Sequence, residues 1–381
     1  MTLRIEVKQE VLNWAIERSG VDAIALHKSF PKLGAWLEGT IQPTLKQLEK
    51  FAKATRTPVG FLFLPDPPYE KVPIPDYRTM VNQRVNRPSA NLLDTIYICQ
   101  QRQEWYRDYA RTNGLPPLGF VGMANHRDSI EWVAQDIRRT LDFDLEARAA
   151  MRTWEDALRN FISSADAVGI MVMCSGIVLN NTRRKLNPEE FRGFALTDSL
   201  APLVFINGAD TKSAQMFTLA HELAHLWLGE SALSSVSLDG NEDIAVERWC
   251  NAVAAELLVP LTVFQTELRD EDLQDSLSRL SRYFKVSTLV ILRRMRDAGH
   301  LSFREYFSAY ETELERLLAL GTGSGGNFYL SQPNKLSKRF ARALVVSTLE
   351  GQTLYRDALR MLGVKKIETF NELGRNLGVM A

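Results

Sequence analysis

Two of the five histidines in this chain, His221 and His225, stand four residues apart in the apolar stretch FTLAHELAHLWLGE. A helix places residues i and i+4 on one face, one turn apart, so both imidazoles would point the same way. Two imidazoles at this spacing can bind one zinc ion, and Glu222, directly after the first, can act as general base. The spacing therefore predicts a catalytic zinc site. A helix with two buried core histidines is the alternative.

A catalytic zinc ion needs a third protein ligand and one open position. The next predicted helix, AVERWCNAVAAELLVP, carries Glu247. At about 100° per residue, the residues that share its face are small or apolar, except for Asn251, while Glu256 falls on the opposite side. A lone carboxylate on an inward face needs a partner, because burying it unpaired is costly. We therefore expect Glu247 to be the third zinc ligand.

Other interpretations of this helix remain open. The helix macrodipole would also favour Glu247 near the N-terminus, without any metal. Asn251 lies one turn from Glu247, and we expect it either to hydrogen-bond a metal ligand from the outer shell or to be an ordinary helix residue. Weaker candidates for the third ligand are Glu230, Glu242, Asp243 and Cys250.

The elements around the motif must position it. Apolar runs in GIMVMCSGIVL, GFALTDS and PLVFING predict three short strands before the motif helix, in a small antiparallel sheet. Helices are predicted near 128–141 and 154–167, and throughout 262–318. The Gly/Ser-rich stretch 229–241 is predicted to be a loop. The expected fold class is therefore α+β and mostly helical, with the sheet behind the motif helix.

At these residues the chain resembles the ImmA/IrrE family of metallopeptidases. The resemblance covers about 155–262 and rests on HELAH and on ERWCNAVAAELLVP, in which Val259 stands where the family usually has methionine. It implies a zincin-like, gluzincin-type peptidase domain. Residues 7–56 are similar to the Xre-type helix-turn-helix domain that often precedes it. The resemblance further implies a regulatory protease, sometimes encoded within toxin–antitoxin modules.

Matched residue by residue, the resemblance implies that His221, His225 and Glu247 bind one Zn²⁺ and that Glu222 is the catalytic base. The expected activity is a zinc endopeptidase of narrow specificity that cleaves a protein partner, such as a repressor or a toxin–antitoxin component. The alternative is a transcriptional regulator or antitoxin that binds DNA or a partner with little proteolysis. The intact HELAH favours the enzyme over the regulator, because a site that no longer catalyses proteolysis could lose Glu222 and still bind its metal.

We expect four parts along the chain. They are a helix-turn-helix-like domain (1–65), a Pro-rich connector and long helix (66–126), a zinc metallopeptidase domain with a helical extension (127–318), and a basic helical C-terminal region (327–381). The sequence GTGSGG, 321–326, is a flexible linker by composition.

The composition of the 381 residues is that of a globular protein, with 45% hydrophobic and 24% charged residues. Three widely spaced cysteines give no disulfide framework, which fits a reducing compartment. The opening MTLRIEVKQE lacks the apolar core of a signal peptide, and no apolar run approaches the ~20 residues that span a bilayer. We therefore expect a cytoplasmic protein without membrane contact.

The net charge is zero, but both ends are basic. Residues 1–65 carry nine Lys/Arg against six Asp/Glu, and residues 327–381 carry nine against four. The segment that would read DNA, HKSFPKLGAWLEG, offers only Lys28, Ser29 and Lys32 near base edges. Lysines contact phosphates without reading sequence, so we expect DNA contact to be weak or non-specific. Docking of a protein partner is the alternative role for this domain.

Overall fold

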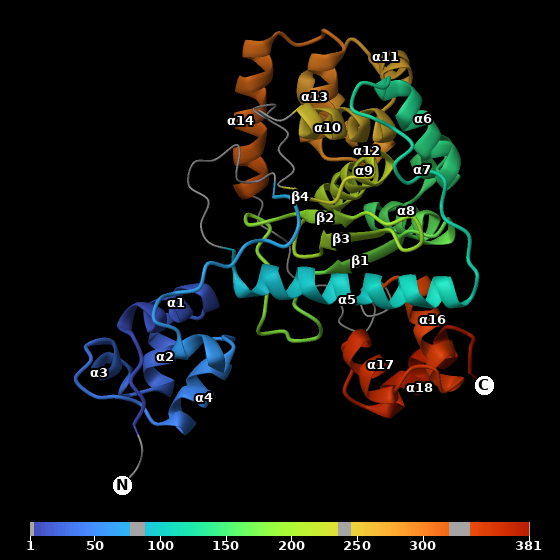
Figure 1. The fold of residues 1–381 in the computed structure, drawn as a ribbon. Helices are drawn as coiled ribbons and strands as arrows, with labels where there is room; N and C mark the ends of the chain where they lie inside the picture. Colours follow the sequence, from blue (N-terminus) through green and yellow to red (C-terminus); the bar gives the residue numbers. More distant parts are fainter. Residues whose placement is uncertain (1–3, 77–87, 235–244, 320–335, 381) are drawn as a thin grey trace. The chain divides into compact units, whose positions relative to one another are not determined.

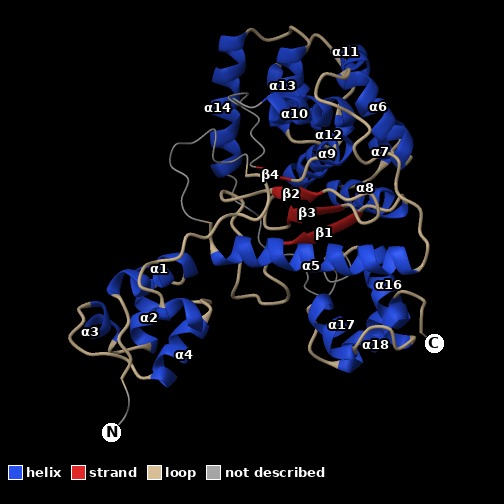
Figure 2. Cartoon of the chain, in the orientation of Figure 1, coloured by secondary structure: helices blue, strands red, loops and turns tan. Residues whose placement is uncertain are grey.

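The structure is a computed structural model that describes residues 4–76, 88–234, 245–319 and 336–380. The chain divides into two compact units, which comprise Met1–Pro73 with Arg84–Tyr97, and Ile74–Gln83 with Ile98–Ala381. Most described residues lie in helices, and the strands form one small sheet (Figure 2). The expected α+β class, mostly helical, is confirmed. No helix among the described residues is both long and apolar enough to cross a membrane.

The first unit is built from short helices around its own core. The elements are α1 (Gln9–Ser19), α2 (Ala23–Ser29), α3 (Leu33–Leu37), α4 (Leu45–Ala54) and the 3₁₀ helix η1 (Val59–Phe63). Thr44 caps α4, and its hydroxyl accepts a hydrogen bond from the backbone N–H of Gln47. Phe30, Trp36 and Phe51 pack against one another inside the unit. The short helices agree with the sequence analysis, while a helix-turn-helix function stays a prediction.

The sheet of the second unit has the strand order β1-β3-β2-β4. Its strands are β1 (Met171–Ser175), β2 (Gly193–Leu196), β3 (Leu203–Asn207) and β4 (Ala232–Ser234). β2 runs antiparallel to both β3 and β4, but β1 runs parallel to β3. The prediction of an antiparallel sheet is therefore wrong for one pair. Residues 176–202, which include β2, connect β1 to β3, and parallel neighbours need such a long connection.

The other regular elements of the second unit are helices (Figure 1). They are α5 (Ala90–Thr112), whose first turns belong to the first unit, α6 (Ile130–Leu141), α7 (Leu145–Ala150), α8 (Trp154–Ala167), α9 (Lys212–Leu228), α10 (Ala245–Leu258), α11 (Leu261–Glu267), α12 (Leu273–Phe284), α13 (Thr288–Asp297), α14 (Phe303–Ala319), α16 (Lys338–Leu349), α17 (Tyr355–Leu362) and α18 (Ile367–Asn376). The predicted linker 321–326 lies outside the described residues.

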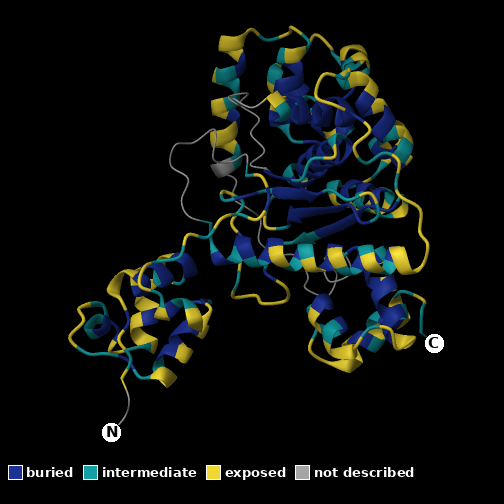
Figure 3. Ribbon diagram, in the orientation of Figure 1, coloured by how far each residue is buried: buried dark blue, intermediate teal, exposed yellow. Residues whose placement is uncertain are grey.

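The second unit is layered around α9. This helix packs on β2 and β3, and α8 packs on β1 beside it, so the two helices cover one face of the sheet. On its other side α9 packs against α10, which in turn contacts α6. Figure 3 shows α9, α10 and the strands as the most deeply buried part of this unit. Because α9 lies between the sheet and a second layer of helices, it is buried on all sides. This explains why apolar residues occur all around the helix and not on one face alone.

Candidate metal centre

Both ends of α9 are fixed by local contacts. The hydroxyl of Thr211 accepts a hydrogen bond from the N–H of Ala214 and caps the first turn. The helix ends at Gly229, which has a φ of 73° and donates its N–H to the last turn. A side chain at Gly229 would also meet the backbone of Gly122, because an added Cβ would lie 2.9 Å from its Cα. Only glycine satisfies both demands here.

The segment before α6 wraps the C-terminal end of α9. Gly122 and Ala124 donate their N–H groups to the carbonyls of Leu226 and Trp227, at 3.0 and 2.9 Å. The indole of Trp227 donates to a carboxylate oxygen of the buried Asp136 at 2.9 Å. The two backbone bonds provide hydrogen-bond donors to carbonyls in the last turn of α9. This role could not be predicted from the sequence, because nothing around Gly122 indicates its distant partner.

The two histidines of α9 and Glu247 of α10 meet in the protein interior. His221 and His225 are fully buried, and Glu247 is 4% exposed. Nε2 of His221 lies 3.2 Å from Nε2 of His225. The carboxylate of Glu247 places one oxygen 3.3 Å from the former and the other 3.1 Å from the latter. The structure thus brings together the three residues that the sequence predicted as ligands.

Asn251 contacts this cluster from the outer side. Its Oδ1 lies 2.9 Å from Nδ1 of His221, and both side chains are fully buried. An amide oxygen only accepts hydrogen bonds, so Nδ1 carries the proton and Nε2 keeps its lone pair. This is the tautomer that a histidine needs to bind a metal through Nε2. Of the two interpretations of Asn251, the structure favours the hydrogen-bond partner.

The charge states also suit a metal. Burial lowers the pKa of His225, although the nearby Glu247 carboxylate opposes the shift. Burial alone would raise the pKa of Glu247, but the charges and hydrogen bonds of His221 and His225 outweigh it and hold this pKa well below its usual range. At neutral pH the site therefore offers neutral imidazole at His225 and an ionised carboxylate. Metal binding requires these forms of the two groups.

The donor set fits zinc. The ligand atoms of His221, His225 and Glu247 all lie within 4.8 Å of one another. Tetrahedral zinc with bonds of about 2.0–2.2 Å separates its ligand atoms by roughly 3.3–3.6 Å, and the observed separations lie close to that range. Three protein ligands of the types N, N and O leave one coordination position open. Such an open position is typical of catalytic rather than structural zinc sites.

Glu222 lies against the sheet. Its carboxylate is fully buried, and a Cβ added at Gly193 of β2 would lie 3.0 Å from its Oε1. The same Cβ would lie 2.6 Å from Cγ2 of Thr218 and 2.9 Å from the carbonyl oxygen of Phe205. Gly193 therefore lets β2 approach α9 closely at the position of Glu222. The role of Gly193 was not predicted from the sequence, where the only indication is a glycine at the start of a predicted strand.

Replacing Gly193 with alanine is expected to destabilise the protein by about 1–3 kcal/mol, because overpacking of this size usually costs that much. Urea denaturation would measure the change. Gly119→Ala is the matched control in the same unit, because an added Cβ there meets nothing within 4 Å. Equal stability of the two variants would contradict the close approach of β2 to α9.

The remaining candidates lie elsewhere. Glu230 is half-buried beyond the end of α9, and Cys250 is buried, but neither belongs to the cluster of three ligands. Glu242 and Asp243 lie outside the described residues. Glu256 faces away from the site, as expected, and pairs with Arg294 in the interior.

The residues predicted to contact DNA are exposed, but they do not share one helix. Lys28 and Ser29 end α2, and Lys32 precedes α3. The Ser29 hydroxyl donates to the carbonyl of Ala25 at 2.9 Å, so it is partly engaged within its own helix. Contact with DNA through these residues stays a prediction.

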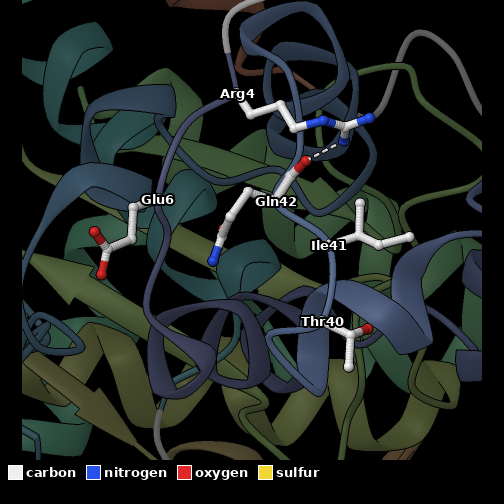
Figure 4. Close-up of a pocket in the computed structure, with 5 residues that line it drawn as sticks. All are labelled: Arg4, Glu6, Thr40, Ile41 and Gln42. Carbon is white, nitrogen blue, oxygen red and sulfur yellow. Dashed lines mark hydrogen bonds between the residues drawn. The ribbon is translucent and has the colours of Figure 1, made fainter.

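A pocket of about 590 Å³ lies in the first unit, between its N-terminal segment and the loop before α4 (Figure 4). Its lining residues are Arg4, Glu6, Thr40, Ile41 and Gln42. The guanidinium of Arg4 donates to the carbonyl of Gln42 at 2.5 Å. The lining contains no histidine or cysteine, and it does not resemble the donor set of the second unit.

Residues 165–296 match the peptidase family described as the IrrE N-terminal-like domain. This segment contains α9 and α10, and therefore every residue of the metal cluster. The match covers about a third of the chain, supports the resemblance to the ImmA/IrrE family and suggests a metallopeptidase-like function. Residues 336–376, which include α16–α18, match a domain of unknown function, DUF8813. None of the curated proteins compared with the chain matches it.

Proposed function

We propose that the chain is a zinc-dependent endopeptidase with one zinc ion per chain. The observation that carries this proposal is the convergence of two imidazole nitrogens and a carboxylate at 3.1–3.3 Å in the interior. The match of this segment to a peptidase family supports it independently. His221, His225 and Glu247 are the zinc ligands, and Asn251 orients His221 through the hydrogen bond to Nδ1.

Glu222 is the general base in this proposal. When bound, a zinc ion would supply Lewis-acid catalysis, polarising the scissile carbonyl and lowering the pKa of water towards about 7. Glu222 accepts a proton from the attacking water and delivers it to the leaving amine. Its neighbour along the chain, His221, is a ligand, so the base and the metal cluster sit on the same turn of α9. The Gly193 backbone packs beside the carboxylate.

The substrate we propose is a regulatory protein partner, such as a repressor or a toxin–antitoxin component. Support comes from the resemblance to the ImmA/IrrE family. The product of a neighbouring gene is the first candidate for the cleavage assay.

Removing the metal tests this proposal. Protein stripped with a chelator should lose cleavage of the candidate partner, and about one equivalent of zinc should restore it, whereas magnesium should not, because the site has nitrogen ligands. Zinc at about 100 times its Kd should also stabilise the stripped protein by ~2.7 kcal/mol, which thermal unfolding would report without any substrate. Unchanged cleavage after complete removal of zinc would contradict the proposal.

A further inference from the structure

The edge of the sheet lies close to the proposed base. Ser234 of the edge strand β4 is the direct partner of Gly193, whose backbone packs beside Glu222. An edge strand presents backbone N–H and C=O groups that can pair with another extended segment. Peptides are often bound in this way, as an added strand. A substrate in extended conformation that paired with β4 would therefore lie next to the strand that contacts Glu222.

The chain itself occupies this edge (Figure 1). Asp76 forms a parallel bridge with Leu233, and the N–H of Leu233 donates to the carbonyl of Pro75 at 2.9 Å. Because the N–H of Leu233 donates to Pro75, it points away from β2, in which Phe194 lies opposite Leu233. Ile74 is 9% exposed, while Pro73 and Pro75 on either side are exposed. Among the described residues, the buried side chain of Ile74 and the hydrogen bond from Leu233 to Pro75 contribute to holding this segment at the edge.

Because of its prolines, the segment Ile74–Asp76 cannot pair with β4 as a complete strand. Pro75 has no N–H to donate, so the segment cannot form a full ladder with β4. The two prolines also keep the backbone extended without requiring many contacts. A peptide with ordinary residues would form more hydrogen bonds with the same edge and could replace it. The segment directly follows Pro73, the residue after which the chain passes from the first unit into the second.

We propose that Ile74–Asp76 is an intramolecular strap that competes with an extended peptide substrate for the edge of β4. The inference rests on the proposed peptidase function and specifies its substrate: a segment in extended conformation, with an apolar side chain in the place of Ile74 and free N–H groups. Cleavage requires the strap to leave the edge.

Hydrogen exchange tests whether the strap holds the edge. Ile74→Asp places a charge at a buried position and should release the strap, so the backbone N–H of Leu233 should exchange at least tenfold faster in the full-length protein. Ile74→Ala is a gentler second variant that should act in the same direction. Tyr69→Asp is the matched control, because Tyr69 lies in the same connector and is 83% exposed. Circular dichroism verifies the fold of each variant.

Peptide binding tests whether the edge accepts a new strand. The probe is a fluorescent peptide with the sequence of residues 70–76, EKVPIPD. It should bind Ile74→Asp at least tenfold more tightly than wild type or Tyr69→Asp, measured by anisotropy. Equal exchange rates of the Leu233 N–H and equal peptide affinities in wild type and both Ile74 variants would contradict the proposed strap.

Cleavage assays separate this proposal from the peptidase function. With a cleaved partner, release of the strap should lower KM several-fold and leave kcat nearly unchanged. If exchange and peptide binding respond as expected but no variant cleaves any partner, the strap is supported and the peptidase function fails. If the partner is cleaved with the same KM by wild type and both Ile74 variants, the peptidase function stands and the strap as a competitor fails.

Discussion

Replacing Glu222 with glutamine is expected to abolish peptide cleavage while the fold and the bound metal remain. Glutamine has nearly the same shape as glutamate but cannot accept the proton of the attacking water, and a general base typically contributes a factor of 10²–10⁴. The measurement is kcat on a protein partner, together with zinc content. Because Glu222 is fully buried beside Gly193, the isosteric change should avoid the packing loss that alanine would cause.

Glu155→Gln is the matched control, since it makes the same chemical change at an exposed position on α8. It should cleave at the wild-type rate. A Glu222→Gln protein that also cleaved at that rate would show that another group supplies the base. Failure of all three proteins, wild type included, to cleave any partner would instead favour a regulator that binds its partner without proteolysis.

Replacing Glu247 with alanine should weaken zinc binding by more than 100-fold. The reason is that loss of even an outer hydrogen-bond partner of a metal ligand typically costs 10–100-fold in affinity, and Glu247 contacts both histidines directly. Competition with a chromophoric chelator would measure the affinity. The protein should remain folded without zinc, because the cluster sits within a large apolar core.

The choice of control for Glu247 depends on the structure. Glu256 is the other glutamate of α10, but its buried pairing with Arg294 makes it unsuitable, because breaking such a pair usually costs 3–5 kcal/mol. Glu230→Ala is the better comparison, since Glu230 was the alternative carboxylate ligand in the described part of the chain and lies outside the cluster. Zinc retained in Glu247→Ala and lost in Glu230→Ala would reverse the assignment.

Local sequence patterns were sufficient to predict the helices of the site. α9 begins just after the predicted strand PLVFING and ends at Gly229, and α10 ends just before Pro260. Helical spacing also placed Glu247 and Asn251 on the inward face, where both are found buried. These predictions depended only on residues within a few turns of one another, so periodicity and helix-ending residues contained the necessary information.

Contacts between distant segments could not be predicted in this way. The parallel pairing of β1 with β3 depends on which strand lies next to which, and alternation along a strand does not record its neighbour. β4 has only three residues, too few to show alternation, and the stretch was predicted to be a loop. The approach of Gly193 to Glu222 and of Gly122 to Gly229 likewise joins segments that have no common local pattern.

The central claim is that His221, His225 and Glu247 together hold one zinc ion. The most direct test is X-ray diffraction from crystals of the wild-type protein, with data recorded above and below the zinc absorption edge. We expect one strong anomalous peak per chain, within about 2.0–2.2 Å of Nε2 of both histidines and of a Glu247 oxygen. The absence of a peak at these three side chains in zinc-soaked crystals, or a peak bound by other residues, would contradict it.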